Sequence, residues 1–374
     1  MITIDPNNKA LVDFIRRRAD KKNPWLEIWQ SDEAITINAG TARVTFQAPR
    51  LEHDDNFEKV TITAETLKVL PVALQDMGDG LARVTYPGGV IMHQTSTRVV
   101  VADRENSPSG VEGVVTLPPA FLSALGNVAP AASKAHDRYI LQGVNVRAVA
   151  DVQAGIKLAA CDGRMLRVAQ VPVDRLPAIA PNITIPSAAV AQLLKIPAGV
   201  KKDCLIQMTW GERHVSFLIQ SHAGSMEIDS HILEMGLGDA CRGSFPNYAL
   251  VTPTPGDVPV TVTVDAGRLA EAVKAMKPAW NVTATVTSVK LRLDAAGDSG
   301  ALHVVGTGDA QVLVPCVREP SASLSIAFDP VLLLTLLGTY DGAVTLRFAD
   351  ELSPCLMGNS EMTDFAVLMP CRLA

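Results

Sequence analysis

The sequence predicts an α+β protein made of repeated strand-helix units that place helices on antiparallel sheet. The main observation is a strand pattern in which two apolar residues flank a hydroxyl residue, as in a strand with one buried face. A helix pattern follows every copy, and the 374-residue chain is too long for one hydrophobic core. The six strand patterns lie at 2–5, 60–63, 115–118, 183–186, 262–265 and 324–326.

Each strand pattern leads directly into a predicted amphipathic helix. In the first helix Leu11, Val12, Ile15 and Ala19 form an apolar stripe, which is typical of a helix that lies on a sheet. The six helices are predicted at 6–19, 64–74, 119–128, 187–196, 266–276 and 330–340.

Four of these helices have a candidate N-cap, namely Asp5, Thr63, Asp265 and Asp329. A side-chain oxygen at this position can accept from the unpaired N–H groups of the first turn. Asp5 and Asp329 are each followed by Pro, whose missing N–H costs nothing at the first helical position.

The stretches between the units alternate like further strands and contain glycine turns. Turn-forming residues cluster near 106–110 and 252–257. A strand followed by a helix is common, and a central Thr can reflect β-propensity alone, but six copies in one order favour duplication of a single unit. Grouping the units in pairs predicts three similar domains, each with two helices on antiparallel sheet, at 1–112, 113–253 and 254–374.

Several protein classes are disfavoured by composition. No apolar run approaches the roughly 20 residues that cross a bilayer, so we expect no membrane association. The N-terminal apolar residues are followed by Arg16, Arg17 and Arg18, unlike a secretory signal, and we expect a cytoplasmic protein. The six cysteines never form a C-x-x-C pair, so we expect reduced core residues, no metal and no cofactor.

Charge is unevenly distributed along the chain. The formal net charge of −6 argues against a nucleic-acid partner. However, the windows that hold the six helices contain fifteen basic and eleven acidic residues, which gives +4 and leaves about −10 for the remainder. A basic helix face is usually solvated surface, but an acidic remainder suggests that the helices face a polyanion.

Helix packing limits how such helices could surround DNA. With axes about 9 Å apart, six helices on a circle have no room for a duplex inside. Twelve helices give a circle of about 34 Å with roughly 24 Å clear, which passes a duplex of about 20 Å. Two chains are therefore needed.

Four stretches carry a more specific signal, and they read "YILQGVNV" (139–146), "LAACDGRMLRVAQVPVD" (158–174), "GSFPNYALVTP" (243–253) and "FAVLMPCRLA" (365–374). They resemble the bacterial DNA polymerase III β subunit family, the sliding clamps, in order and spacing. The resemblance covers the second and third predicted domains, whereas the first matches only in its repeat pattern.

This resemblance implies a ring-shaped, head-to-tail homodimer whose helices surround duplex DNA. Such a protein is a DNA polymerase processivity factor with no catalytic residues of its own. Its implied partners are duplex DNA of any sequence, the replicative DNA polymerase, the clamp loader and repair proteins with a clamp-binding peptide motif.

The resemblance also implies a peptide-binding pocket between the second and third domains. Mostly apolar walls suit a peptide with a Gln and two large apolar residues. Without the family match, most of these residues would be interpreted as ordinary core. Cys161, Arg164 and Met165 depart from the Thr, His and Arg that are common in the family, and Ala374 extends the usual end, which puts peptide preference in doubt. The pocket residues are Arg138, Ile140, Leu141, Cys161, Gly163, Arg164, Leu166, Pro253, Val258, Val367, Leu368, Met369, Pro370 and Arg372.

Two further sets of residues are predicted for DNA contact and for the subunit joint. The joint is expected to use an edge strand of the first domain, with Val99 and Val101, against the third domain near Met276. A lone Tyr139 is more often a packed strand residue, although it matches a family aromatic near DNA. The DNA-contact residues are Arg16, Arg17, Lys21, Lys22, Lys134, Tyr139, Lys201, Lys202 and Lys274.

An enzyme and a non-encircling module are the two alternatives to a clamp. An enzyme is disfavoured because the histidines occur singly and the chain has no H-E-x-x-H, G-x-S-x-G or G-x-x-x-x-G-K motif. The acidic stretch 52–55 is more typical of a solvated turn than of a metal site. The second alternative is a clamp-like peptide-binding module that does not encircle DNA.

Overall fold

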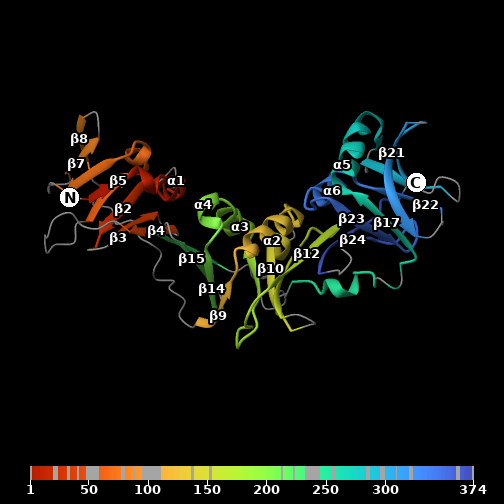
Figure 1. Cartoon of the computed structure of the whole chain (residues 1–374), viewed down its shortest axis with the longest axis horizontal. Helices are drawn as coiled ribbons and strands as arrows, with labels where there is room; N and C mark the ends of the chain where they lie inside the picture. Colours follow the sequence, from red (N-terminus) through yellow and green to blue (C-terminus); the bar gives the residue numbers. More distant parts are fainter. Residues whose placement is uncertain are drawn as a thin grey trace. The chain divides into compact units, whose positions relative to one another are not determined.

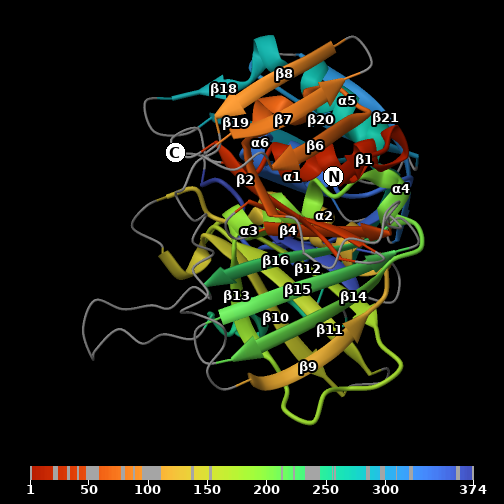
Figure 2. The same cartoon turned by 90° about the vertical axis from the view of Figure 1, so that its left-hand side faces the viewer.

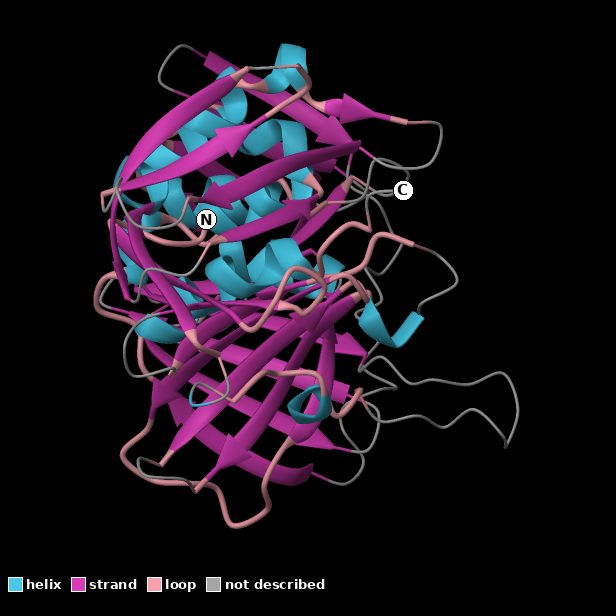
Figure 3. Ribbon diagram, turned by 90° about the vertical axis from the view of Figure 1, so that its right-hand side faces the viewer, coloured by secondary structure: helices cyan, strands magenta, loops and turns pink. Residues whose placement is uncertain are grey.

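The computed structural model is an α+β fold of antiparallel sheets with short helices (Figure 1). Strands predominate over helices in the described part of the chain (Figure 3). None of the described helices has the length and apolar character of a membrane span. The structure describes residues 2–19, 24–31, 34–39, 42–47, 59–76, 81–86, 89–94, 111–135, 139–150, 154–211, 214–221, 224–231, 245–254, 256, 258–283, 287–294, 300–308, 310–319, 323–358 and 363–372.

All six predicted repeat strands are present, and each is followed by a helical segment. The strands are β1 (Ile2–Ile4), β5 (Lys59–Thr63), β9 (Val111–Leu117), β13 (Asn182–Pro186), β17 (Val260–Asp265) and β22 (Leu324–Phe328). The segments after them are η1 (Pro6–Asn8) with α1 (Lys9–Arg16), η2 (Ala64–Lys68), α2 (Ala120–Val128), α3 (Ser187–Leu194), α5 (Ala266–Ala275) and α6 (Pro330–Leu337).

The second predicted helix is wrong in type and length. Only the 3-10 helix Ala64–Lys68 forms, and β6 (Val72–Asp76) occupies the rest of the predicted 64–74 helix. Pro71 lies between them, and an interior proline removes a helix hydrogen bond and clashes with the preceding turn. Its neighbour Leu70 is also biased towards extended backbone, so the chain leaves the helix there.

Three of the four predicted N-caps hold their helices as expected. Asp5 accepts from Asn7 N at 2.7 Å, and Asp265 accepts from Arg268 N at 2.8 Å. Asp329 Oδ1 accepts from the first turn of α6 at 2.9 and 3.3 Å. Thr63 instead places its hydroxyl 3.2 Å from that of Thr66.

The chain divides into two compact units. The first unit comprises Met1–Leu122, Val173–Pro181 and Ala188–Ile232. It holds a four-stranded sheet, β1-β6-β7-β8, and an eight-stranded sheet, β5-β2-β3-β4-β16-β15-β14-β9. Figure 2 shows β16, β15, β14 and β9 side by side. The remaining elements are β2 (Trp25–Gln30), β3 (Ala34–Ala39), β4 (Ala42–Gln47), β7 (Leu81–Tyr86), β8 (Gly89–Gln94), α4 (Ala198–Lys201), β14 (Leu205–Gly211), β15 (His214–Ser221) and β16 (Gly224–His231).

The second unit comprises Ser123–Pro172, Asn182–Ser187 and Leu233–Ala374. Its sheet runs β13-β10-β11-β12-β25-β24-β23-β17-β21-β20-β19-β18, and β22 pairs with β19. The elements not yet given are η4 (Ala129–Ala131), η5 (Tyr139–Leu141), β10 (Gly143–Val149), β11 (Gly155–Cys161), β12 (Met165–Pro172), η6 (Tyr248–Leu250), η8 (Lys277–Ala279), β18 (Asn281–Val282), β19 (Thr287–Leu293), β20 (Ala301–Val305), β21 (Gln311–Glu319), β23 (Ala343–Phe348), β24 (Cys355–Gly358) and β25 (Asp364–Leu368).

The repeat strands pair by one recurring rule. We define a half as one repeat strand, its helix and the strands that follow, up to the next repeat strand. Each repeat strand pairs with a strand of the other half, as β1 does with β6 and β5 with β2. The same exchange links β9 to β14 and β13 to β10, and then β17 to β23 and β22 to β19. The rule supports duplication of one unit, while the boundaries after residues 112 and 253 stay a prediction.

Three residues of the predicted apolar stripe of α1 are buried, since Leu11, Val12 and Ile15 are each at most 1% exposed. The fourth, Ala19, lies beyond the end of the helix and is half-buried, while Phe14 is buried as well. The repeat strands bury alternate residues, as in the buried Ile2 and Ile4 of β1. The helical period of α1 and the two-residue period of the repeat strands both place apolar residues in the core. This is why apolar spacing along the sequence predicted these elements.

Gly113 offers a test of packing in the first unit. It lies opposite Trp210, and a Cβ added at Gly113 would lie 2.2 Å from the indole, which is only 2% exposed. We expect Gly113→Ala to lower the free energy of unfolding by about 1–3 kcal/mol, because the indole must move within a packed core. Gly199 in α4 has no heavy atom near an added Cβ, so Gly199→Ala is the control. Equal urea midpoints for the two variants would contradict this packing.

Candidate functional site

The candidate site is built on the pairing of β12 with β25 in the second unit. These antiparallel strands come from distant parts of the sequence, and their register sets Leu166 opposite Val367. Both residues belong to the predicted peptide pocket. The pairing therefore brings together the two motifs that carry the pocket prediction.

A buried apolar cluster surrounds this register pair. Cys161, Tyr248 and Phe365 are partly buried and pack against it. Five predicted pocket residues are thus gathered here: Ile140, Leu141, Leu166 and Val367 in the cluster and Cys161 beside it. The cluster consists of Ile140, Leu141, Ala159, Leu166, Val168, Phe245, Leu356 and Val367.

The turn between β11 and β12 fixes the backbone of Arg164. Asp162 Oδ1 accepts from the backbone N–H groups of Arg164 and Met165, both at 2.8 Å. Gly163 has a φ of 91°, which an L side chain rarely adopts, so a glycine is required in this turn. The turn presents the Arg164 side chain to solvent, 62% exposed.

The C-terminal segment is attached to this turn and to β22. Met369 N donates to Arg164 O at 2.9 Å, and Cys371 N donates to Ala327 O at 2.7 Å. Met369 is 43% exposed, so an apolar side chain is accessible beside the turn. Burial, together with the Asp329 carboxylate, raises the pKa of the Cys371 thiol, which keeps it protonated.

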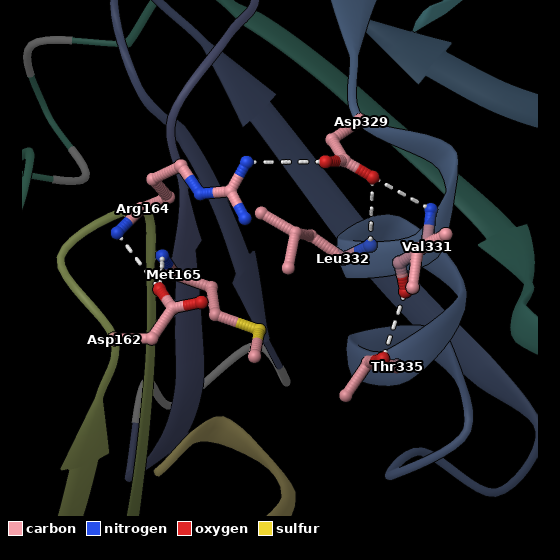
Figure 4. Close-up of polar contacts among 7 residues, drawn as sticks. All are labelled: Asp162, Arg164, Met165, Asp329, Val331, Leu332 and Thr335. Carbon is pink, nitrogen blue, oxygen red and sulfur yellow. Dashed lines mark hydrogen bonds and ion pairs between the residues drawn. The ribbon is translucent and has the colours of Figure 1, made fainter. Parts of the chain in front are cut away.

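Asp329 brings the start of α6 to the same place. Its Oδ2 accepts from Arg164 Nη1 at 3.2 Å, while Oδ1 caps α6 through Val331 N and Leu332 N (Figure 4). Val331 is 59% exposed, and Leu332 is 7% exposed. The ion pair joins the β11–β12 turn to a helix whose residues are more than 160 positions away.

Sequence reasoning placed Asp329 as a helix cap only and did not assign it to the site. Phe245 and Tyr248 were also missed, although both lie in one of the four family-like stretches. Their aromatic rings make an edge contact with centroids 6.4 Å apart. The presence of aromatic residues within a matched motif was the available signal.

Other predicted pocket residues lie elsewhere or outside the described residues. Leu368 is fully buried and alternates with Val367, so it lies on the opposite face of β25 from the cluster. Pro253 and Val258 are not members of the cluster, and Arg138 lies outside the described residues. Gly163, Pro370 and Arg372 belong to the turn and the C-terminal segment.

Arg167 holds the opposite face of the β12–β25 pairing. The side chain is fully buried and forms an ion pair with Asp364. Its Nη1 also donates to Val168 O at 2.8 Å and to Phe365 O at 3.2 Å, and Nε donates to Thr339 Oγ1 at 2.8 Å. The guanidinium thus connects β12, β25 and the segment after α6.

Tyr340 completes this network. The Arg167 guanidinium carbon lies 4.4 Å from the centroid of its ring, and the hydroxyl donates to Met357 O at 3.1 Å. Burial raises the pKa of Tyr340, so the hydroxyl remains a donor. A polar cavity of about 480 Å³ lies beside the network and shares no residue with the apolar cluster. Its lining is Asn127, Gly338, Thr339, Tyr340, Asp341, Ala343 and Asp364.

Several predicted DNA-contact residues lie at the C-terminal ends of separate helices. Arg16 and Arg17 end α1, Lys202 follows α4, and Lys274 lies in the last turn of α5. Cations at these ends interact favourably with the helix dipole. No charged residue occurs within α2, α3 or α6, so the basic residues of the described α-helices belong to α1, α4 and α5, where Lys9 and Arg268 lie near the N-terminal ends.

Several of these cations have structural partners. Arg16 Nε lies 3.5 Å from an Asp13 carboxylate oxygen, and Lys201 Nζ donates to Leu194 O at 2.7 Å. Burial opposes ionisation of Asp13, but Lys9, Arg16 and Arg17 outweigh it and lower the pKa of Asp13. Arg17, Lys134, Lys202 and Lys274 are exposed. Lys21, Lys22 and the Tyr139 side chain lie outside what the structure describes.

Arg18, in the turn after α1, is a basic residue with a structural role. Its guanidinium lies over the Phe14 ring at 4.3 Å, and Nη2 donates to Gln192 O at 3.2 Å. Burial, together with the charge of Arg17, lowers the pKa of Arg18. Arg18 therefore links α1 to α3 within the first unit.

Of the three residues predicted for the subunit joint, the structure describes only Met276. Val99 and Val101 lie outside the described residues. Met276 is 5% exposed, because it packs against Gly306, where an added Cβ would lie 2.7 Å from its Cε. The joint near Met276 stays a prediction, and in the single chain the Met276 side chain is itself buried. Leu313 and Val317 on β21 are exposed by 51% and 71%.

Candidate metal ligands are not gathered anywhere in the described ranges, where no group of three or more His, Cys, Asp or Glu could hold an ion. Of the six cysteines, the structure describes five, all of them free thiols. Cys204 and Cys355 are buried, as expected for core residues.

Neither a scan of protein-family models nor a search of curated proteins finds a match. Solved structures match over the full length. The sliding clamp (DNA polymerase III subunit beta) of Bartonella birtlesii bound to griselimycin is 20% identical, with 100% of this chain and 99% of that one covered at a TM-score of 0.78. The chain has the sliding-clamp fold.

Two other sliding-clamp structures match as closely. The DNA polymerase sliding clamp of Pseudomonas aeruginosa is 16% identical and covers 100% of this chain and 99% of its own at a TM-score of 0.80. The DNA polymerase beta subunit of Streptococcus pyogenes is 16% identical and covers 99% of each chain at a TM-score of 0.77. These matches confirm the predicted fold class, although the sequence identities are only 16–20%.

A double-mutant cycle tests the Arg167 network in this clamp fold. Asp364→Ala leaves a buried guanidinium without its carboxylate, so we expect the free energy of unfolding to fall by roughly 2–4 kcal/mol. Adding Arg167→Met removes the buried charge and should recover at least half of that loss. Asp341→Ala, an exposed carboxylate beside the same cavity, is the control and should change stability by less than about 0.5 kcal/mol. Equal losses for Asp364→Ala and Asp341→Ala would show that the pair is unimportant.

Proposed function

We propose that this protein is a DNA sliding clamp: a homodimeric ring that encircles duplex DNA and tethers a replicative polymerase through a short peptide. The observation that carries the proposal is the full-length match to bacterial sliding clamps, at TM-scores near 0.8. Five of the predicted peptide-site residues gather around the β12–β25 pairing, which also supports the proposal.

Strand pairing supports ring closure by two copies. Within the chain, β4 pairs with β16, and β12 pairs with β25. In each case the last strand of a first half meets the last strand of a second half in the following predicted domain. By the same rule, β21 of one copy would meet β8 of another, because these are the corresponding strands that remain. The exposed Leu313 and Val317 on β21 would then be covered at a head-to-tail joint. The residues predicted for this joint, Val99 and Val101, follow β8 in the sequence.

The DNA contact in this proposal is electrostatic and independent of sequence. A ring is retained on DNA by topology, so weak phosphate contacts are sufficient and permit sliding. The exposed Arg17, Lys134, Lys202 and Lys274 are the strongest candidates, and Arg16, Lys21, Lys22, Tyr139 and Lys201 complete the proposed set. Because few basic residues lie on the described helices, few phosphate contacts are expected, which fits a weak contact with DNA.

The peptide site is the means by which a clamp without catalytic residues acts. Polymerase, clamp loader and repair proteins would insert a large apolar side chain beside Leu166 and Val367, with Met369 adapting to different ligands. Replication in the cytoplasm is the setting that this function implies. Structures of two matched clamps contain griselimycin, so this compound is a suitable first candidate to test as a competitor of the peptide.

Topological retention on DNA is the decisive test of this function. After incubation with a clamp loader and ATP, the protein should remain on nicked circular DNA during gel filtration at high salt. Linearising the DNA with a restriction enzyme should release it, because a ring slides off a free end. A peptide-binding module that does not encircle DNA would bind peptides but would elute away from the circular DNA.

Charge reversal tests the proposed DNA face. We expect Arg17→Glu with Lys274→Glu to reduce affinity for duplex and to lower the slope of log K against log salt by about 1–2, because two phosphate contacts are lost. Arg83→Glu with Arg147→Glu reverses two exposed charges on strands and is the matched control. Identical salt slopes for the two double variants would exclude the helix ends from the DNA contact.

A further inference from the structure

The polar cavity beside the Arg167 network has a volume of about 480 Å³, which is typical of small-molecule sites. Asn127 lines it from the last turn of α2, Asp341 from the segment that follows α6, and Asp364 from the start of β25. No Lys, Arg or His occurs among the described lining residues. The cavity therefore presents acidic and neutral groups to a ligand.

The hydroxyl groups in the cavity wall are already committed to the protein. Thr339 Oγ1 accepts from Arg167 Nε at 2.8 Å and donates to Leu336 O at 2.7 Å. The Tyr340 hydroxyl donates to Met357 O at 3.1 Å. A hydroxyl carries a single O–H, so neither of these two groups has a donor left for a ligand.

The two carboxylates of the wall keep acceptor oxygens for a ligand. Asp364 forms its ion pair with Arg167 through Oδ1, and its side chain is 38% exposed. Asp341 is exposed and has no ion-pair partner in the described part of the chain. Because Arg167 balances the charge of Asp364 only, the negative charge of Asp341 is uncompensated. The C-terminal ends of α2 and α6 at this cavity also favour a cation, through the helix dipole.

These groups define the class of ligand. A metal ion is disfavoured, because the described residues gather no group of three His, Cys, Asp or Glu that could hold one. Acceptor oxygens without free hydroxyl donors match a ligand that is rich in N–H groups, and the uncompensated charge selects a cationic one. Two carboxylates match two ammonium groups, and Ala343 offers apolar surface to the methylenes between them.

We propose that this cavity binds a short aliphatic diamine or polyamine, with one ammonium group at Asp341 and another at Asp364. The side-chain oxygen of Asn127 accepts a further N–H from the ligand. Charge-assisted N–H to carboxylate bonds supply the affinity, since they are stronger than neutral hydrogen bonds. This binding site is separate from the peptide site and does not depend on the clamp function.

Isothermal titration calorimetry of the full-length protein, without DNA and at moderate salt, tests the proposal. The probes are putrescine, spermidine and n-butylamine, which keeps one ammonium group on a chain of the same length as putrescine. We expect putrescine to bind at one site per chain. Its affinity should exceed that of butylamine about threefold to fivefold, because the second ammonium group reaches a second carboxylate.

Three variants locate the binding at the cavity. Asp341→Asn should lower the affinity for putrescine about threefold to fivefold, to that of butylamine. Glu271→Gln removes one exposed carboxylate from α5 and is the matched control, which should bind putrescine as the unmodified protein does. Ala343→Lys supplies an ammonium group from the cavity wall itself and should abolish binding.

Four results would overturn the proposal. Equal losses for Asp341→Asn and Glu271→Gln would show attraction by net charge alone, and equal affinities for putrescine and butylamine would exclude a ligand that spans two carboxylates. Tighter binding of Nα-acetyl-lysine amide than of putrescine would assign the cavity to a lysine side chain of another protein. Absence of binding by every amine would remove the site. Retention on circular DNA tests the clamp function separately from all four.

Discussion

The antiparallel pairing of β12 with β25 is the contact on which the candidate site depends. It sets Leu166 opposite Val367 and thereby joins two sequence motifs into one buried apolar cluster. On its other face the buried Arg167 binds Asp364 and two carbonyl oxygens, so a shift of register would leave a charge without partners. The pairing is thus specified by packing on one face and by charge on the other.

The same kind of contact recurs elsewhere in the chain. Strand exchange between halves holds each pair of repeat units together, and the joint of β4 with β16 resembles that of β12 with β25. Each of these joints pairs the last strand of a first half with the last strand of a second half in the following predicted domain. The corresponding strands that have no such joint within the chain are β21 and β8. The proposed head-to-tail ring gives these two strands the same type of joint, between two copies.

Sequence periodicity predicted the six repeat strands and most of the helices, because these depend on local apolar spacing and capping. It failed at 64–74, where Pro71 prevents an apolar stretch from being helical. The Arg164–Asp329 pair, the Arg167 network and the burial of Met276 depend on strand register and on distant turns, which no local pattern encodes. The family-like motifs predicted residues that the fold brings into one cluster, and the contact of Asp329 with Arg164 became visible only in the fold.

Sedimentation velocity on the intact protein and on a Leu313→Lys, Val317→Lys variant tests the head-to-tail ring most directly. At micromolar concentration the account predicts a particle of twice the 39.8 kDa chain mass for the intact protein and a folded single chain for the variant. A single chain for the intact protein, or an unchanged dimer for the variant, would contradict closure through β21.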